Sequence, residues 1–148
     1  MGIAASQAAT ERWLMLLLDS EAISAVASGP PGRRDKVRAL IGEMRARNFP
    51  VVTVASTLAE VVRGRPADAR VFAGLRRERV EVQPVVTRVG VRAGQLLGKV
   101  RAGSEMAVDA FTVAVADREG GAIVATSDPD DFRRLAEYAT GVVIADIR

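Results

Sequence analysis

Short apolar runs alternate with amphipathic segments along most of the chain. The runs are LMLLL, VVTVA, VEVQPV, AIVAT and VVIAD, at residues 14–18, 51–55, 80–85, 122–126 and 142–146. They are rich in Val, Ile and Leu and shorter than a typical helix, so they predict buried strands. Parallel strands need a crossover between them, which is usually a helix. The alternation therefore predicts a parallel sheet with helices on both faces.

The segments between these runs carry helix signals. Asp19 or Ser20 is expected to cap the helix after the first strand, and Ser56 or Thr57 to start the helix that contains LAEVVRG. Apolar residues at helical spacing predict further helices at residues 37–48, 67–79, 87–100, 104–120 and 129–139. Each predicted strand is thus separated from the next by at least one predicted helix.

The length and the distribution of apolar residues predict one domain. The chain has 148 residues, of which 49% are hydrophobic, so it can bury one sizeable core. The first dozen residues lack the basic start and apolar block of a signal peptide, and no apolar run is long enough to span a membrane. We therefore expect a flexible tail at residues 1–12, a single domain at residues 13–148, a cytoplasmic location and no membrane association.

Composition narrows the chemistry that the chain can perform. It contains no cysteine and no histidine, which excludes disulfides, thiol nucleophiles and the commonest transition-metal ligand. Catalysis would have to rest on carboxylates, hydroxyls, Lys or Arg, and a hard cation bound by oxygen becomes the expected cofactor. The formal net charge of +3 permits a nucleic acid as partner without requiring one.

Two acids follow the first two predicted strands. Asp19 ends the first strand, in the crevice where open parallel sheets bind their ligands. It is equally well interpreted as a helix cap. Glu60 is expected in the first turn of the helix after the second strand, where it reaches the same crevice; it could also form a capping box with Thr57.

A third acid interrupts a predicted apolar helix face. Met106, Ala110, Val113 and Ala114 mark the buried stripe, and Asp109 lies on or beside it. An unpaired carboxylate there would cost several kcal/mol or stay protonated, so it needs a partner. That partner is either a structural Arg or a cation shared with other acids.

The last acids follow the strand AIVAT. Asp128 ends the triplet TSD, and Asp131 begins the next helix within DPDDF; one of Asp128, Asp130 and Asp131 is expected to cap that helix. Four separate segments thus place an acid at one edge of one sheet, which capping alone explains poorly. Such a cluster repels itself unless a divalent cation neutralises it. The hydroxyls of neighbouring residues are candidates to position ligands or a phosphate, or are simply turn residues: Ser20, Thr126 and Ser127.

The ordered set of motifs resembles a PIN domain, and in particular the VapC-type ribonuclease toxins of bacterial toxin–antitoxin pairs. The motifs are LLLDSEAI, STLAEVVRG, AGQLLGKV followed by MAVDAFTVAVA, and ATSDPDDF, which together span residues 14 to 137. The resemblance implies a three-layer α/β/α fold with a central parallel sheet of four to five strands. It also implies Mg²⁺ or Mn²⁺ in the acidic site and cleavage of RNA, often tRNA or rRNA.

The resemblance also assigns roles. By matching positions, Asp19, Glu60, Asp109 and Asp128 would be the catalytic metal ligands, with Asp131 supporting them. Such toxins commonly form homodimers and are silenced by a cognate antitoxin that obstructs the site. Glu21 departs from the small or polar residue that many relatives carry, and it either adds charge to the site or faces solvent.

In a ribonuclease, the basic residues near these motifs would contact the RNA. The candidates for contact with RNA phosphates are Arg33, Arg34, Lys36, Arg38, Arg63 and Arg65, although a solvated surface explains each of them equally well. One Trp and one Tyr offer little for base stacking, so recognition through backbone shape is expected.

Two other classes of protein remain possible from the sequence. A catalytically silent PIN-like module would bind RNA or a protein, although such a module could afford to lose one of the acids. A receiver-type phosphoacceptor would need a Lys after a late strand, but the only lysines, Lys36 and Lys99, lie in predicted helices. The leading hypothesis is therefore a metal-dependent endoribonuclease.

Overall fold

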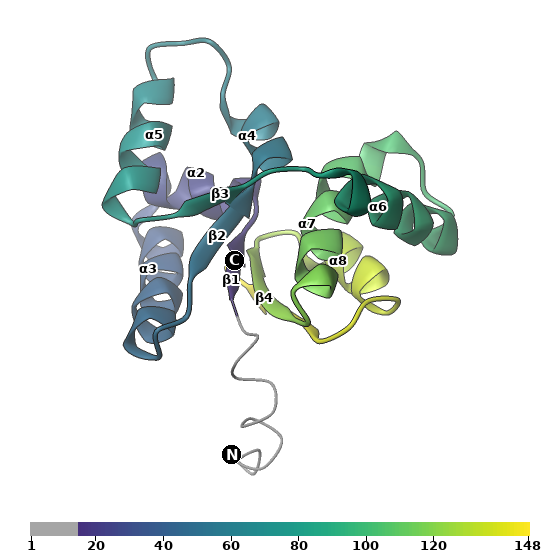
Figure 1. The fold of residues 1–148 in the computed structure, drawn as a ribbon. Helices are drawn as coiled ribbons and strands as arrows, with labels where there is room; N and C mark the ends of the chain where they lie inside the picture. The colour runs from purple at the N-terminus through teal and green to yellow at the C-terminus, as the bar shows by residue number, and fades with distance from the viewer. Residues whose placement is uncertain (1–14) are drawn as a thin grey trace.

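The computed structural model describes residues 15–148, and Figure 1 shows their arrangement. The tail expected at residues 1–12 lies outside the described residues, as do Trp13 and Leu14, where the first strand was expected to begin. Within the described part of the chain, no helix is long and apolar enough to cross a membrane.

Five parallel strands form one central sheet. They are β1 (Leu16–Leu18), β2 (Val51–Val54), β3 (Glu81–Gln83), β4 (Ala122–Thr126) and β5 (Val142–Asp146). Their order across the sheet is β3-β2-β1-β4-β5, and every neighbouring pair is parallel. The alternation of runs in the sequence predicted this parallel sheet, and the expectation is confirmed.

Helices connect the strands. They are α2 (Ser20–Ser28), α3 (Pro31–Ala46), α4 (Ala55–Val61), α5 (Asp68–Arg77), α6 (Thr87–Val100), a short 3₁₀ turn η2 (Ser104–Met106), α7 (Ala107–Arg118) and α8 (Pro129–Ala136). Helix α4 starts at Ala55, directly after β2, rather than at Ser56 or Thr57. The segment expected as one helix at residues 104–120 begins with the 3₁₀ turn before α7.

Both faces of the sheet are covered, which makes three layers. Leu16 and Leu18 of β1 pack in one core with α2, α3 and α5, whereas Leu17 packs in a second core with α6, α7 and α8. Figure 1 shows α2, α3 and α5 on one side of the strands, and α6, α7 and α8 on the other. All three β1 leucines are fully buried because successive side chains of a strand point to opposite faces. The expected three-layer α/β/α fold is thereby confirmed.

The strand order creates one switch point. The chain goes from β1 outward through β2 to β3, then returns to the other side of β1 with β4 and β5. Loops after β1 and β4 therefore diverge to opposite faces, and a crevice opens beyond their carboxyl ends. The backbone N–H of Asp19 donates to the carbonyl of Ala125 at 3.2 Å, which joins the two strands at that place.

Candidate functional site

Asp19 lies at the centre of the switch point and is both a cap and a buried acid. Its side chain is at the N-cap of α2, where Oδ1 accepts a hydrogen bond from the Ala22 N–H at 3.0 Å. The residue is only 5% exposed. Burial raises the pKa of Asp19 to about 6, although hydrogen bonds from the Thr126 hydroxyl and the Ala22 N–H act in the opposite direction. Asp19 is therefore a helix cap and, at the same time, a buried acid at the predicted crevice.

Asp109 is the acid on which the others converge. It lies in the first turn of α7 and is partly buried. Its pKa is raised to about 7, first by burial and then by the negative charges of Glu60, Asp19, Asp131 and Asp128, in that order. No ion pair joins Asp109 to any Lys or Arg among residues 15–148. The structural Arg considered from the sequence is therefore not its partner.

Glu60 reaches this crevice from an unexpected place in its helix. Because α4 starts at Ala55 and ends at Val61, Glu60 lies in its last turn, so the expected first-turn position is wrong. A carboxylate near a helix C-terminus is opposed by the helix dipole, so neither dipole complementarity nor a capping box explains it. The Thr57 hydroxyl is buried and has no hydrogen-bond partner among residues 15–148, which also argues against the capping box. Glu60 is exposed, and α4 packs against both α2 and α7.

The acids that follow β4 are more exposed to solvent than Asp19. Asp128 occupies the N-cap position of α8, as expected for one of these acids. Its side chain, however, makes no capping hydrogen bond. Its backbone N–H donates to the Thr126 hydroxyl at 3.0 Å. Asp131 is half-buried and forms an ion pair with Arg134 at 3.6 Å, and Asp130 pairs with Arg133 at the same distance. Asp128 therefore keeps a carboxylate without a hydrogen bond from the α8 backbone.

Buried hydroxyls support the end of β1. Thr126 is fully buried, whereas Ser20 and Ser127 are half-buried. Sequence reasoning missed Thr53, a buried residue of β2 whose hydroxyl donates to the Leu18 carbonyl at 2.8 Å. This bond fixes the backbone directly before Asp19. A polar residue inside the otherwise apolar run VVTVA was the available signal.

The basic residues predicted to contact RNA lie in different surroundings. Arg33 of α3 forms an ion pair with Glu21 at 3.7 Å, so Glu21 is exposed yet neutralised on that side. Lys36 donates from Nζ to the carbonyl of Arg148. The guanidinium of Arg63 instead folds back onto the carbonyls of Ala59 and Val62 at the end of α4. Arg34 is half-buried, and Arg38 and Arg65 are exposed.

The acids suit a divalent cation in their chemistry. Every candidate donor is a carboxylate oxygen, the ligand that hard cations such as Mg²⁺ and Mn²⁺ prefer. The mutual repulsion around Asp109 is the charge distribution that a bound cation would relieve. Within residues 15–148 no three acidic side chains converge closely enough to hold a metal ion as a group. The acidic side chains therefore act on one another through their charges without converging on one point.

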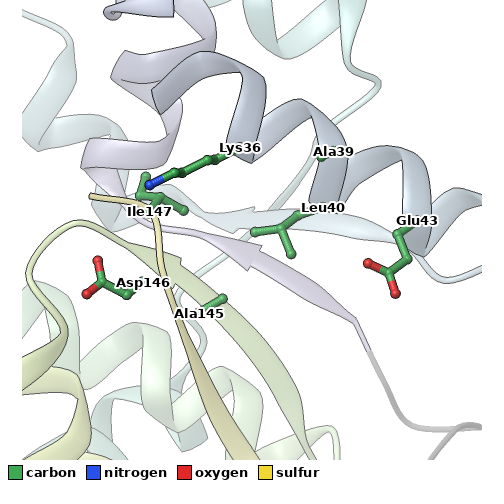
Figure 2. Close-up of a pocket in the computed structure, with 7 residues that line it drawn as sticks. All are labelled: Lys36, Ala39, Leu40, Glu43, Ala145, Asp146 and Ile147. Atoms are coloured by element: carbon green, nitrogen blue, oxygen red, sulfur yellow. The ribbon is translucent and has the colours of Figure 1, made fainter. Parts of the chain in front are cut away.

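A groove of about 320 Å³ lies between α3 and the end of β5 (Figure 2). Its lining is Lys36, Ala39, Leu40, Glu43, Ala145, Asp146 and Ile147. None of the candidate metal ligands lines it, so the groove and the acidic crevice are separate features. Lys36 and Asp146 mark the end of the groove that adjoins the carboxyl ends of β4 and β5.

Comparisons with known proteins agree with this fold. The PIN domain family model matches residues 16–138, so the chain belongs to the PIN domain family. Among solved structures, the chain is similar to a chain of VapBC2 from Rickettsia felis, solved bound to a DNA fragment from their promoter. The match has a TM-score of 0.62 at 12% identity, and it covers 89% of this chain and 98% of that one. No curated protein matches the chain significantly in sequence. The resemblance to a PIN domain is thereby confirmed, and the likeness to the VapBC2 chain shows a shared fold.

Proposed function

We propose that the chain is a divalent-metal-dependent endoribonuclease and the toxin of a toxin–antitoxin pair. PIN domains are typically nucleases that use divalent metal ions, so family membership supports hydrolysis of a phosphodiester. The observation that carries the proposal for this chain is the surroundings of Asp109. Four acids from three other segments act on its pKa together with burial, and among the described residues no Lys or Arg forms an ion pair with it.

Asp19, Glu60, Asp109 and Asp128 would hold the metal in this proposal. When bound, a divalent cation lowers the pKa of water and stabilises the leaving oxygen of a phosphodiester. The chain contributes rigid placement: the Ala22 N–H holds Asp19 Oδ1, and Thr53 holds the carbonyl that precedes Asp19. Asp131 adds negative charge beside Asp109 while Arg134 limits its repulsion.

The family resemblance and the positive charge of the chain support RNA as the proposed substrate. A formal net charge of +3 favours a polyanion. The chain has one Trp, which lies outside the described residues, and one Tyr, Tyr138, which follows α8, so it offers few rings on which bases could stack. Recognition then rests on phosphates and on the shape of the crevice.

We also propose a homodimer and a cognate antitoxin as partners. The similarity to a chain of VapBC2 supports the antitoxin, because that structure contains a complex. Exposed apolar side chains lie on β3 and directly after it, at the edge of the sheet: Val82, Val85 and Val86. A second protein chain that covered this edge would remove them from water.

The experiment is an incubation of total RNA, including tRNA, with the purified chain in Mn²⁺, Mg²⁺ or EDTA, beside Asp19→Asn. An Asn at the cap still accepts from the Ala22 N–H, so the variant loses the charge and keeps the fold. Metal-dependent fragments that are absent with Asp19→Asn would support the proposal. Equal cleavage by both proteins would refute the site, and RNA binding without cleavage by wild type would favour the catalytically silent module instead.

A further inference from the structure

Four cations line one side of the acidic crevice, over the ends of β4 and β5 and the first turns of α3. We call Arg33, Lys36, Arg133 and Arg148 the basic strip. We propose that the basic strip binds the backbone of the nucleic acid next to the scissile bond, with one phosphate on the guanidinium of Arg148. The proposal rests on the proposed nuclease function and adds the direction from which the strand enters the site.

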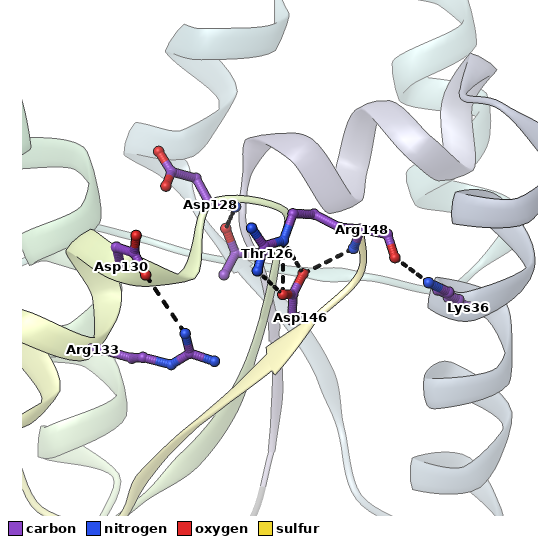
Figure 3. Close-up of polar contacts among 7 residues, drawn as sticks. All are labelled: Lys36, Thr126, Asp128, Asp130, Arg133, Asp146 and Arg148. Atoms are coloured by element: carbon purple, nitrogen blue, oxygen red, sulfur yellow. Dashed lines mark hydrogen bonds and ion pairs between the residues drawn. The ribbon is translucent and has the colours of Figure 1, made fainter.

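The position of Arg148 is set by the sheet. Asp146 of β5 stands in register with Thr126 of β4, and the Ile147 N–H donates to the Thr126 carbonyl at 2.9 Å. The segment that carries Arg148 therefore lies beside the turn that leads to Asp128. Figure 3 shows the Arg148 guanidinium between Asp146 and this turn, and the charges of Asp130 and Asp128 act on it.

The guanidinium of Arg148 is held in place by Asp146 and keeps donors that Asp146 does not use. Its Nε lies 3.0 Å and 2.8 Å from the two carboxylate oxygens of Asp146, and its Nη2 also contacts that carboxylate. Arg148 Nη1 donates to no other group in residues 15–148, and the side chain is 62% exposed. A guanidinium fixed through one edge presents its remaining donors in a set direction, which suits a phosphate.

The other members continue the strip on either side of Arg148. Lys36 Nζ donates to the Arg148 carbonyl, so the first turns of α3 adjoin the end of β5. Arg33, one turn earlier on α3, pairs with Glu21 close to Asp19. Arg133 of α8 is 55% exposed, and its charge reaches Asp146.

The distribution of cations around the acidic crevice sets the path of the substrate. A crevice with five acids repels a polyanion, so the strand must be held by neighbouring cations. On the α4 side, Arg63 uses its guanidinium on the carbonyls of Ala59 and Val62, and Arg65 is the exposed cation that follows it. On the β5 side, three exposed cations lie close together, namely Lys36, Arg133 and Arg148. The strand therefore crosses the ends of β4 and β5 toward α3.

The test measures binding rather than cleavage. A labelled, unstructured oligouridylate is titrated with Asp109→Asn protein in Mg²⁺ at salt between about 50 and 200 mM. Adding Arg148→Gln should weaken binding about threefold to tenfold and reduce the slope of log K against log salt by about 0.7, as expected for one lost phosphate contact on a single strand. Arg148→Lys keeps the charge and should keep the slope.

Arg118→Gln is the matched control. Arg118 is exposed at the end of α7, which leads to the start of β4, so it lies at the opposite edge of the sheet. Equal affinity and slope for Arg148→Gln and Arg118→Gln would overturn the proposal, and so would a failure of the Asp109→Asn protein to bind RNA. Cleavage by wild type is measured separately, so a chain that bound RNA through Arg148 without cutting it would refute the nuclease and leave the strip standing.

Discussion

Asp109 is the residue at which the fold and the proposed chemistry conflict most. A carboxylate in the first turn of a helix is usually stabilised by the helix dipole. Here burial and four neighbouring acids oppose it, and its pKa rises to about 7 instead of falling. Stability sacrificed at one residue is a common sign of a functional site.

This conflict predicts the pH dependence of stability without metal. The folded chain binds a proton at Asp109 more tightly than the unfolded chain, so the stability it contributes is full at pH 4 and is lost as pH rises through about 7. In EDTA at pH 8, Asp109→Asn should therefore be more stable than wild type by about 1–2 kcal/mol, because solvent reaches part of the side chain and limits the effect.

Urea unfolding at pH 8 and at pH 4 measures this difference directly. The advantage of Asp109→Asn should vanish at pH 4, where wild-type Asp109 is protonated in the folded state. An Asn variant that is less stable than wild type at pH 8 would show that a positive group neutralises Asp109 in solution.

The proximity of two acids could be predicted from the sequence because each interrupts an apolar pattern. Asp19 after LMLLL and Asp109 beside a buried stripe were predicted from that conflict, and the structure brings them within electrostatic range. Sequence reasoning failed for Glu60, because nothing before Ala55 signals a helix start and α4 begins directly after β2. Thr53 was missed because a Thr in a strand is ordinary unless its partner carbonyl is known.

At the scale of elements, the ends of β4 and β5 were predicted to the residue, as were both ends of α6. Apolar runs between glycines and acids give sharp boundaries. Both ends of β3 and the end of α8 were less accurate. The limits of β3, a short and exposed edge strand, are set by its pairing with β2.

Substitution of two glycines by Ala should have opposite effects on stability. Gly94 of α6 is exposed with open space around its Cβ position, so Gly94→Ala should stabilise the chain by about 0.5–1 kcal/mol. Gly121, which precedes β4, has φ of +142°, and a Cβ there would lie 2.9 Å from the Gly141 carbonyl oxygen. Gly121→Ala should therefore destabilise it by more than about 1 kcal/mol.

Thermal unfolding of the two variants beside wild type provides the measurement. Because β4 leads to Thr126 and Asp128, Gly121→Ala should also lower activity, whereas Gly94→Ala should not. Loss of stability in Gly94→Ala would mean that the glycines of α6 face a partner rather than open solvent.

At the scale of the whole molecule, strand order explains why the acids meet. Asp19 and Asp128 are far apart in the sequence but follow adjacent strands, and α7 brings Asp109 over the same edge. The sequence predicted the layers and the edge because parallel strands all end on one side. It did not predict which strands are neighbours from the residues alone, since that depends on packing between distant segments.

The central claim is that these separate acids form one cation site, and a Mn²⁺ titration followed by electron paramagnetic resonance tests it most directly. Wild type should bind Mn²⁺, and Glu60→Gln should bind it at least about tenfold more weakly, because it removes one carboxylate from the set. Glu119→Gln, which removes the same charge from the far end of α7, should bind as wild type does. Equal binding by all three proteins would contradict the account.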